Sequence, residues 1–267
     1  MSRSPEAFSL ALIGGPWGRR LARRRAWIDE LPWREPLPQD AIGARVVWTR
    51  TAFSEYASAA AFAEVSAALL AVGAPIDLVA AAGDFIVDEI VHTEAAARIA
   101  AALGGAVALD VDLPRLVRPP TPAAAGDPML WAAELVVRTC CVGESLTRPM
   151  LTLARDVAGS TAIAAALDAI IGDEASHAQL GWWFLDWAEP QLDDAARAHL
   201  GEVAGAALAA FAPILGGGCS DSGLGALACD RYDTGFAAAL PRAVLRPLAA
   251  RGIAVAGSDR EADAADA

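Results

Sequence analysis

Histidine and tyrosine are scarce in this chain of 267 residues, which contains three histidines and two tyrosines. Basic residues are also few, because 21 lysines and arginines stand against 33 aspartates and glutamates, a formal net charge of −12. A chain of that charge repels the phosphates of nucleic acid, so no nucleic-acid partner is expected. No apolar run is long and unbroken enough to span a bilayer, so no membrane partner is expected either.

Cysteine is rare as well, with four residues in the chain. Cys140 and Cys141 are adjacent and cannot easily pair with each other. Cys219 and Cys229 flank a stretch rich in glycine and serine and could pair. We expect free thiols instead, because the chain is long enough to bury a large core without a disulfide scaffold, and we expect a cytoplasmic protein.

The N-terminal region carries the only marked basic tract, the arginines between positions 19 and 25. We interpret this tract as a solvated N-terminal arm. The apolar segment 8–15 is too short for the core of a signal peptide, and the arginines follow it instead of preceding it. No leader sequence is therefore expected.

Hydrophobic residues make up 55% of the chain, and alanine dominates them. Long alanine-rich stretches favour helix over sheet, so the predicted fold class is all-α. Glycine and proline mark where helices stop and start, most clearly at Gly73-Ala74-Pro75. The predicted helices cover about 47–72, 75–103, 128–157, 161–188 and 193–211, with a further stretch at 234–250 that prolines interrupt.

These helices predict two hairpins joined by a proline-rich crossover over residues 106–126, which is long enough to travel the length of a bundle. Residues 46–190 then form a four-helix bundle with a long crossover between its second and third helices. Three regions flank it: an irregular N-terminal segment wrapping the bundle (1–45), additional C-terminal helices with a glycine-rich loop (191–258), and a disordered acidic tail (259–267).

Two of the three histidines occur in the same five-residue phrase, D-E-x-x-H, at 88–92 and 173–177. The glutamate and histidine of each phrase are three residues apart, so they share one face of a helix. Each pair lies on a stripe that is otherwise apolar. Carboxylates buried there are destabilising unless a cation compensates them. The two phrases therefore predict a metal site in a helical core.

Each predicted hairpin carries one phrase on its second helix, and Glu89 and Glu174 are 85 residues apart. If the first helix of each hairpin also supplies a carboxylate, the candidates are Glu55, 34 residues before Glu89, and Glu144, 30 residues before Glu174. These two are 89 residues apart, close to the offset between the phrases. The predicted metal ligands are Glu55, Glu89, His92, Glu144, Glu174 and His177.

The charge sum favours two divalent ions, since four carboxylates carry four negative charges. Oxygen and imidazole ligands suit iron or manganese, so we expect two iron ions, with manganese or a manganese–iron pair as alternatives and zinc less favoured. Asp88 and Asp173 lie one turn before the histidines, where each can accept a hydrogen bond from an imidazole across the bundle. Glu64 and Glu134 are alternative ligands that break the repeat offset.

Two further residues near Glu144 are candidates for a substrate pocket. Arg148, one turn later, is a candidate for binding an anionic substrate; neutralising a carboxylate or extending into solvent are its alternatives. Cys140, one turn earlier, is a candidate for lining the pocket, with plain packing as the alternative. Pro149 removes a backbone hydrogen bond and predicts a kink.

His199 has no ligand pattern around it, so a surface role is expected.

With these motifs the chain resembles the ferritin-like superfamily of dinuclear iron carboxylate proteins, and more closely a poorly characterised bacterial subgroup of it. The resemblance implies a di-iron bundle held by the six ligands named above. Members react two ferrous ions with dioxygen or peroxide, with outcomes from hydroxylation to simple iron oxidation. The resemblance covers about residues 45–190 and rests on the segments 55–62, 73–75, 88–92, 141–144 and 173–177.

The leading functional prediction is a non-haem di-iron oxidoreductase that activates dioxygen or peroxide to oxidise a small organic substrate. The crossover, the fifth helix and the flanking segments exceed what a minimal iron-storage bundle needs. The alternatives are a ferroxidase or peroxide-scavenging protein without an organic substrate, and a non-enzymatic bundle that binds zinc. Besides dioxygen and the substrate, we expect an external electron donor, since no Cys-x-x-Cys pair indicates a rubredoxin-type domain, and consider a homodimer as the assembly.

Overall fold

The computed structural model describes residues 14–33, 37, 41–109, 116, 120–216 and 223–255, and for 211–216 it describes the backbone alone. Within those ranges every regular element is helical and none is a strand, so the all-α prediction is confirmed there. The elements are α1 (Gly15–Arg24), α2 (Ala26–Glu30), α3 (Ile42–Ala71), α4 (Ile76–Ala102), α5 (Pro128–Val136), a π-helical segment (Val137–Glu144), α6 (Ser145–Asp156), α7 (Thr161–Ala188), a 3-10 turn (Glu189–Gln191), α8 (Asp194–Gly216), α9 (Cys229–Leu240), a second π-helical segment (Pro241–Leu245) and α10 (Arg246–Ala249).

Helices α3 and α4 form a hairpin with a tight turn, as Gly73-Ala74-Pro75 predicted. Gly73 has a φ of 65°, a left-handed conformation that glycine adopts without steric cost. The N–H of Ala74 donates to the carbonyl of Leu69 over 3.0 Å, which closes the last turn of α3. Pro75 then caps α4, whose first turn does not need the missing N–H.

The second hairpin pairs α7 with one continuous helix, which runs through α5, the π-helical segment Val137–Glu144 and α6. Asp127 caps α5 by accepting from the N–H of Leu130, and Ser160 caps α7 by accepting from Ile163. The sequence predicted an irregularity at Pro149. The helix instead departs from α geometry upstream of the proline, over the eight residues that end at Glu144.

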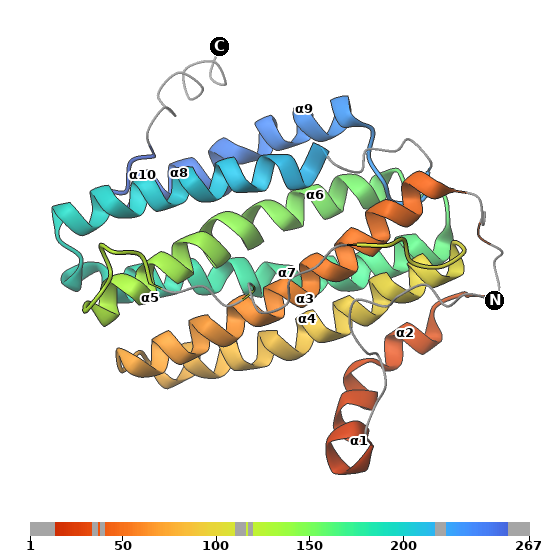
Figure 1. Ribbon diagram of the computed structural model, residues 1–267, viewed down its shortest axis with the longest axis horizontal. Helices are drawn as coiled ribbons and strands as arrows, with labels where there is room; N and C mark the ends of the chain where they lie inside the picture. Colours follow the sequence, from red (N-terminus) through yellow and green to blue (C-terminus); the bar gives the residue numbers. More distant parts are fainter. Residues whose placement is uncertain are drawn as a thin grey trace.

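Figure 1 shows α3, α4, α7 and the continuous α5–α6 helix lying side by side. Their inward faces make two clusters of buried apolar side chains. Phe62, Phe85 and Phe184 belong to one cluster, and Trp48 and Ile163 belong to the other. Between the two clusters lies a layer of buried carboxylates and imidazoles, which is the only polar layer inside the described core that all four helical segments share.

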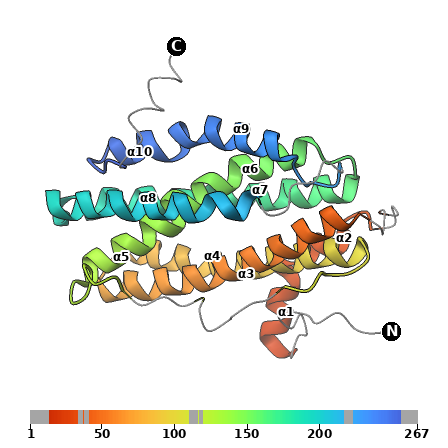
Figure 2. The ribbon, with the colours of Figure 1, turned by 45° about the horizontal axis from the view of Figure 1, so that its top comes forward.

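Helices α8, α9 and α10 form an outer layer on the continuous helix, on the side away from α3 and α4 (Figure 2). Helix α8 contacts the π-helical segment Val137–Glu144, and α9 contacts α6. A guanidinium nitrogen of Arg197 on α8 donates to the carbonyl of Arg251, beyond α10, over 2.6 Å. The additional C-terminal helices expected from the sequence are therefore present in the described residues.

The N-terminal segment differs from the irregular arm predicted for residues 1–45. It contains α1 and α2, and α3 begins at Ile42. Arginine, alanine and leucine favour helix in this stretch, whereas the sequence interpretation gave more weight to the prolines that follow it. The side chain of Ile28 is fully buried, so α2 packs on the bundle.

Other predictions concern parts of the chain that the structure describes incompletely. The tail 259–267, residues 1–13 and most of the crossover lie outside the described residues, as does Cys219. Cys140 and Cys141 are free, as predicted. Cys229 is disulfide-bonded, so the prediction of a free thiol there is wrong. Among the described helices, none combines the length and the apolar character that a membrane-spanning helix needs.

Candidate metal centre

The polar layer of the core, or metal layer, contains the six predicted metal ligands. Helix α3 contributes one glutamate, the π-helical segment contributes another at its last residue, and α4 and α7 each contribute a glutamate and a histidine from the same face. All six side chains are buried, with exposed fractions between 0 and 6%. These residues are Glu55, Glu89, His92, Glu144, Glu174 and His177.

The six residues form two overlapping groups of possible metal ligands. Within each group, one donor atom from every residue lies within 4.8 Å of the others. Glu89 and Glu174 belong to both groups, because each carboxylate has two oxygens and lies at the centre of the layer. The first group adds Glu55 and His92, and the second adds Glu144 and His177.

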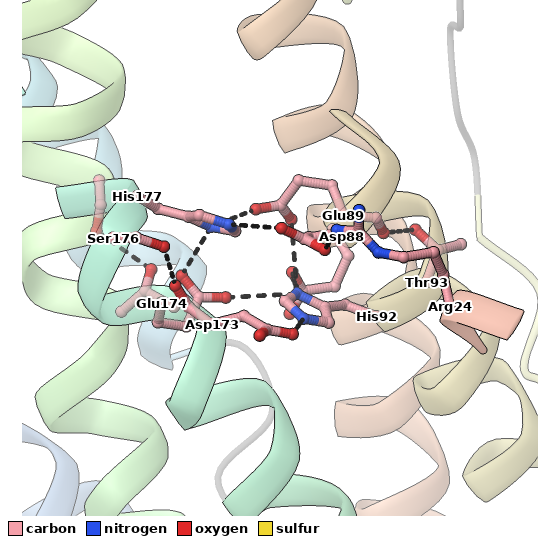
Figure 3. Close-up of polar contacts among 12 residues, drawn as sticks. Arg24, Asp88, Glu89, His92, Thr93, Asp173, Glu174, Ser176 and His177 are labelled. Carbon is pink, nitrogen blue, oxygen red and sulfur yellow. Dashed lines mark hydrogen bonds and ion pairs between the residues drawn. The ribbon is translucent and has the colours of Figure 1, made fainter. Parts of the chain in front are cut away.

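Both histidines direct Nδ1 toward these carboxylates (Figure 3). Nδ1 of His92 lies 3.4 Å from Oε1 of Glu174 and 3.8 Å from Oε2 of Glu55. Nδ1 of His177 lies 2.9 Å from Oε1 of Glu89 and 3.3 Å from Oε2 of Glu174. The two Nδ1 atoms therefore face the same layer from opposite helices, as two imidazole ligands of a shared site require.

The opposite nitrogen of each histidine faces an aspartate of the other D-E-x-x-H phrase. Nε2 of His92 lies 3.2 Å from Oδ2 of Asp173, and Nε2 of His177 lies 3.6 Å from Oδ2 of Asp88. A proton held on Nε2 by the aspartate leaves the lone pair of Nδ1 available to a metal ion. The predicted hydrogen bond across the bundle is confirmed between His92 and Asp173, whereas Asp88 faces His177 at a distance longer than a hydrogen bond.

Several buried atoms of the layer have no hydrogen-bond partner among the described residues. They are both carboxylate oxygens of Glu89 and of Glu174, Nδ1 of His92, and both ring nitrogens of His177. The short distance between His177 and Glu89 does not change this, because the groups are not aligned as donor and acceptor. An unsatisfied buried polar atom costs about 1–3 kcal/mol, and more when it is charged. Cations bound among these atoms would satisfy them, so the residues fit a metal centre.

The pKa values of the residues in this layer also indicate that the buried carboxylates need a compensating positive charge. Burial, together with the neighbouring carboxylates, raises the pKa of Glu89 and of Glu144 well above the usual range. Burial alone would lower the pKa of His177, but its contacts with carboxylates raise that pKa to about 12. Although burial opposes it, contact with the two imidazoles lowers the pKa of Glu174. Without metal ions, protons would compensate the buried carboxylates.

Apolar side chains enclose the histidine of the second group. The ring of Phe85 lies 4.3 Å from the ring of His177, and that of Phe62 lies 5.3 Å from it, between centroids. The two phenylalanines also contact each other edge to face at 5.5 Å. These rings keep water away from one side of the layer, which strengthens the electrostatic interactions inside it.

The two candidates for a substrate pocket lie in different environments. Arg148 is exposed and is not brought to the metal layer, so it extends into solvent. Cys140 is fully buried and packs beside Gly181, where an added Cβ would lie 2.8 Å from its own Cβ. Burial, with the charges of Cys141, Glu144 and Glu89, raises the pKa of the Cys140 thiol, so it stays protonated.

Neither alternative ligand belongs to the metal layer. Glu134 is fully buried, but its Oε1 lies 2.6 Å from Nε2 of His199 and accepts a hydrogen bond from Thr121. The expectation of a surface role for His199 is therefore wrong, because that side chain is the partner of a buried carboxylate. Glu64 lines a surface hollow of about 290 Å³ between α3 and α5, together with Pro120 and Trp131.

The sequence interpretation missed one contact at the edge of the layer. Arg24, in the basic tract assigned to a solvated arm, donates to the carboxylate of Asp88 (Figure 3). The signal available was the tract itself, an unusual cluster of arginines in an acidic chain.

Comparisons of the chain with models of protein families, with curated proteins and with solved structures found no match. The chemistry of the site is therefore argued from its geometry.

Proposed function

We propose that this chain is a ferritin-like protein that holds two iron ions in its helical core and uses them, with dioxygen or peroxide, to oxidise a small organic substrate. One observation carries the proposal. Two groups of buried donors share Glu89 and Glu174, so the layer offers two adjoining cation sites linked by carboxylates. Pairs of Glu-x-x-His helices and two single glutamates are the ligand set of dinuclear carboxylate bundles.

The donor set favours iron over harder or softer metals. Four carboxylates and two imidazoles, without a thiolate in either group, suit iron or manganese and give two divalent ions a neutral total charge. When bound, the pair of ions supplies the redox chemistry. A manganese pair or a manganese–iron pair satisfies the same ligands, so analysis of the metals in the protein as purified from cells decides between them.

The chain's own residues divide the remaining work. Glu89 and Glu174 belong to both groups of donors and would hold both ions, and Glu55 and Glu144 would each complete one site. Asp173 accepts a hydrogen bond from Nε2 of His92, which leaves Nδ1 free to bind, and Asp88 faces Nε2 of His177 at 3.6 Å. The phenylalanine rings beside His177 exclude water from that side. An external donor would supply the electrons that return the centre to its reduced state.

Metal counting with matched variants tests the site. The protein is loaded with ferrous iron without oxygen, and bound iron is counted, with about two ions per chain expected. Glu89→Ala or Glu174→Ala should lose both ions, because each removes a shared ligand. Glu55→Ala or Glu144→Ala should retain about one ion. Glu134→Gln, in the same helix as Glu144 but outside both groups, is the control and should keep the wild-type count.

Oxygen reactivity tests the chemistry separately. Adding dioxygen or peroxide to the loaded protein should change its near-ultraviolet and visible spectrum, and the change should be absent from Glu174→Ala. A wild-type count near zero, or loss of iron from Glu134→Gln, would contradict the site assignment. Binding of zinc alone without oxygen reactivity would make the chain a metal-stabilised bundle. Rapid iron oxidation that leaves every organic substrate unchanged would make it a ferroxidase.

A further inference from the structure

Arg24 connects the N-terminal helix α1 to the metal layer. One of its terminal nitrogens, Nη1, lies 2.7 Å from Oδ1 of Asp84, and the other, Nη2, donates to Oδ1 of Asp88. Both aspartates are on α4, one turn apart, so the guanidinium spans two carboxylates of the same helix face. Figure 3 shows Arg24 reaching Asp88 from outside the bundle.

Asp88 uses its two oxygens in different directions. Oδ1 accepts from Arg24, while Oδ2 lies 3.6 Å from Nε2 of His177. The arginine therefore fixes the carboxylate that faces this imidazole across 3.6 Å. Because a carboxylate held at one oxygen has less freedom to rotate, its other oxygen keeps its position relative to the ring.

The corresponding aspartate of the other phrase has no such support. Asp173 faces Nε2 of His92 at 3.2 Å, but 45% of its side chain is exposed, against 14% for Asp88. In the part of the chain that the structure describes, no arginine is paired with Asp173. The two halves of the metal layer are thus alike in their ligands and different in what holds their histidines.

The position of Arg24 depends on how α1 and α2 dock on α4. Helix α1 has no buried residue of its own. Charge pairs join the segment to α4: Nε of Arg25 lies 2.6 Å from Oε2 of Glu94, and Arg98 lies 2.6 Å from Asp29. These contacts place the N-terminal helix where its arginine can reach Asp88.

We propose that Arg24 is a positioning residue of the metal centre, acting through Asp88 on His177, so that docking of α1 increases the affinity for the ion bound with Glu144 and His177. This inference rests on the proposed function, because it needs two bound ions. The expected effect is limited to one of the two sites. Loss of Arg24 weakens metal binding at the site of Glu144 and His177 and leaves binding at the site of Glu55 and His92 unchanged.

Cobalt(II) binding to the full chain tests the asymmetry, since the visible absorption of cobalt reports its ligands. Glu55→Ala leaves one site and Glu144→Ala leaves the other, so Arg24→Gln is introduced into each. Loss of a group that orients a metal ligand costs about 10–100-fold in affinity, and we expect about tenfold for Arg24→Gln in the Glu55→Ala protein. No change is expected in the Glu144→Ala protein.

The control variant is Arg155→Gln, which removes another exposed arginine with two contacts to one carboxylate, that of Asp168. It should leave both affinities unchanged. Arg24→Lys should restore part of the affinity, because a lysine can reach only one of the two aspartates. In the Asp88→Asn protein, Arg24→Gln should have no further effect, since the arginine acts through that carboxylate.

The outcomes separate this inference from the proposed function. If the wild-type protein fails to bind two cobalt ions, the proposed function fails and the inference fails with it. If wild type binds two ions but Arg24→Gln matches Arg155→Gln, only the inference is overturned. It is also overturned if Arg24→Gln weakens both sites equally, or adds its full effect to that of Asp88→Asn.

Discussion

At the scale of single residues, the metal layer is defined by atoms that lack a partner. Glu89 and Glu174 have four buried carboxylate oxygens without a hydrogen bond among the described residues. By contrast, the equally buried Glu134 has His199 and Thr121 as partners for one of its oxygens. Each buried glutamate among the residues that the structure describes therefore has either a protein partner or a place in the proposed metal centre.

The pair formed by Glu134 and His199 should stabilise the fold without affecting metal binding. His199→Ala leaves a fully buried carboxylate without its closest partner, so we expect the free energy of unfolding to fall by about 2–3 kcal/mol. Chemical denaturation measures this loss. Glu134→Gln should lose less, because the amide still bonds to both neighbours. Iron counts should stay at the wild-type value, and a lower count in His199→Ala would contradict the separation of the two clusters.

At the scale of secondary structure, the π-helical segment Val137–Glu144 determines how one ligand enters the layer. Glu144 is its last residue, and Ser145 donates from its hydroxyl to the carbonyl of Cys140 over 3.0 Å. A π-helical turn changes the direction in which every following side chain points, compared with a continuous α-helix. Such turns are frequent at functional sites. The segment packs against α7 where Gly181 allows a close approach.

Gly181 of α7 should tolerate no larger residue without a loss of stability. A Cβ there would lie 2.7 Å from Sγ of Cys141 and 2.8 Å from Cβ of Cys140, so the π-helical segment would have to move. We expect Gly181→Ala to lower the free energy of unfolding by about 1–3 kcal/mol and to weaken iron binding through Glu144.

Gly172, also in α7, provides the matched control for that substitution. It is exposed, and an added Cβ would meet nothing within 4 Å. Gly172→Ala should therefore raise the free energy of unfolding by about 0.5–1 kcal/mol, because alanine favours helix. Thermal unfolding of both variants measures the difference. Equal stability of the two would show that the contact between α7 and the π-helical segment is looser than the structure indicates.

At the scale of the whole molecule, the core is two apolar clusters separated by the metal layer. Each of the four long helical segments crosses from one cluster to the other and contributes its ligand where it crosses. The two clusters bring the helices together, and the layer between them carries negative charge that needs compensation. The proposed ions would thus contribute to stability as well as to chemistry.

Metal binding should therefore raise the thermal unfolding temperature of the whole chain. An ion that binds only the folded state adds about 2.7 kcal/mol at a hundred times its dissociation constant. Differential scanning fluorimetry with ferrous iron under anaerobic conditions, and with a chelator, measures this gain. Glu174→Ala lacks a ligand of both sites and should show no metal-dependent rise. A rise as large in Glu174→Ala as in wild type would place the stabilising ion elsewhere.

Much of the fold could be predicted because helix signals are local. The alanine-rich stretches, the Gly73 stop and the Pro75 start predicted the α3–α4 hairpin to within a few residues. The N-terminal helices were missed in part because Arg24 and Arg25 find their closest acidic partners on α4, far away along the chain. The partner of Glu134 was missed for the same reason, since His199 is 65 residues away along the chain. The disulfide at Cys229 was rejected because a chain with a large core was expected to need none.

The sequence by itself determined which six residues gather in the core. The three-residue spacing of each glutamate and histidine places them on one helix face, and the repeat offset identifies Glu55 and Glu144. Only the tertiary structure decided which carboxylates belong to both groups of donors, which aspartate faces which imidazole, and that Arg24 contacts Asp88. Those features depend on distances between helices that are far apart along the chain, and such distances follow from packing, not from periodicity.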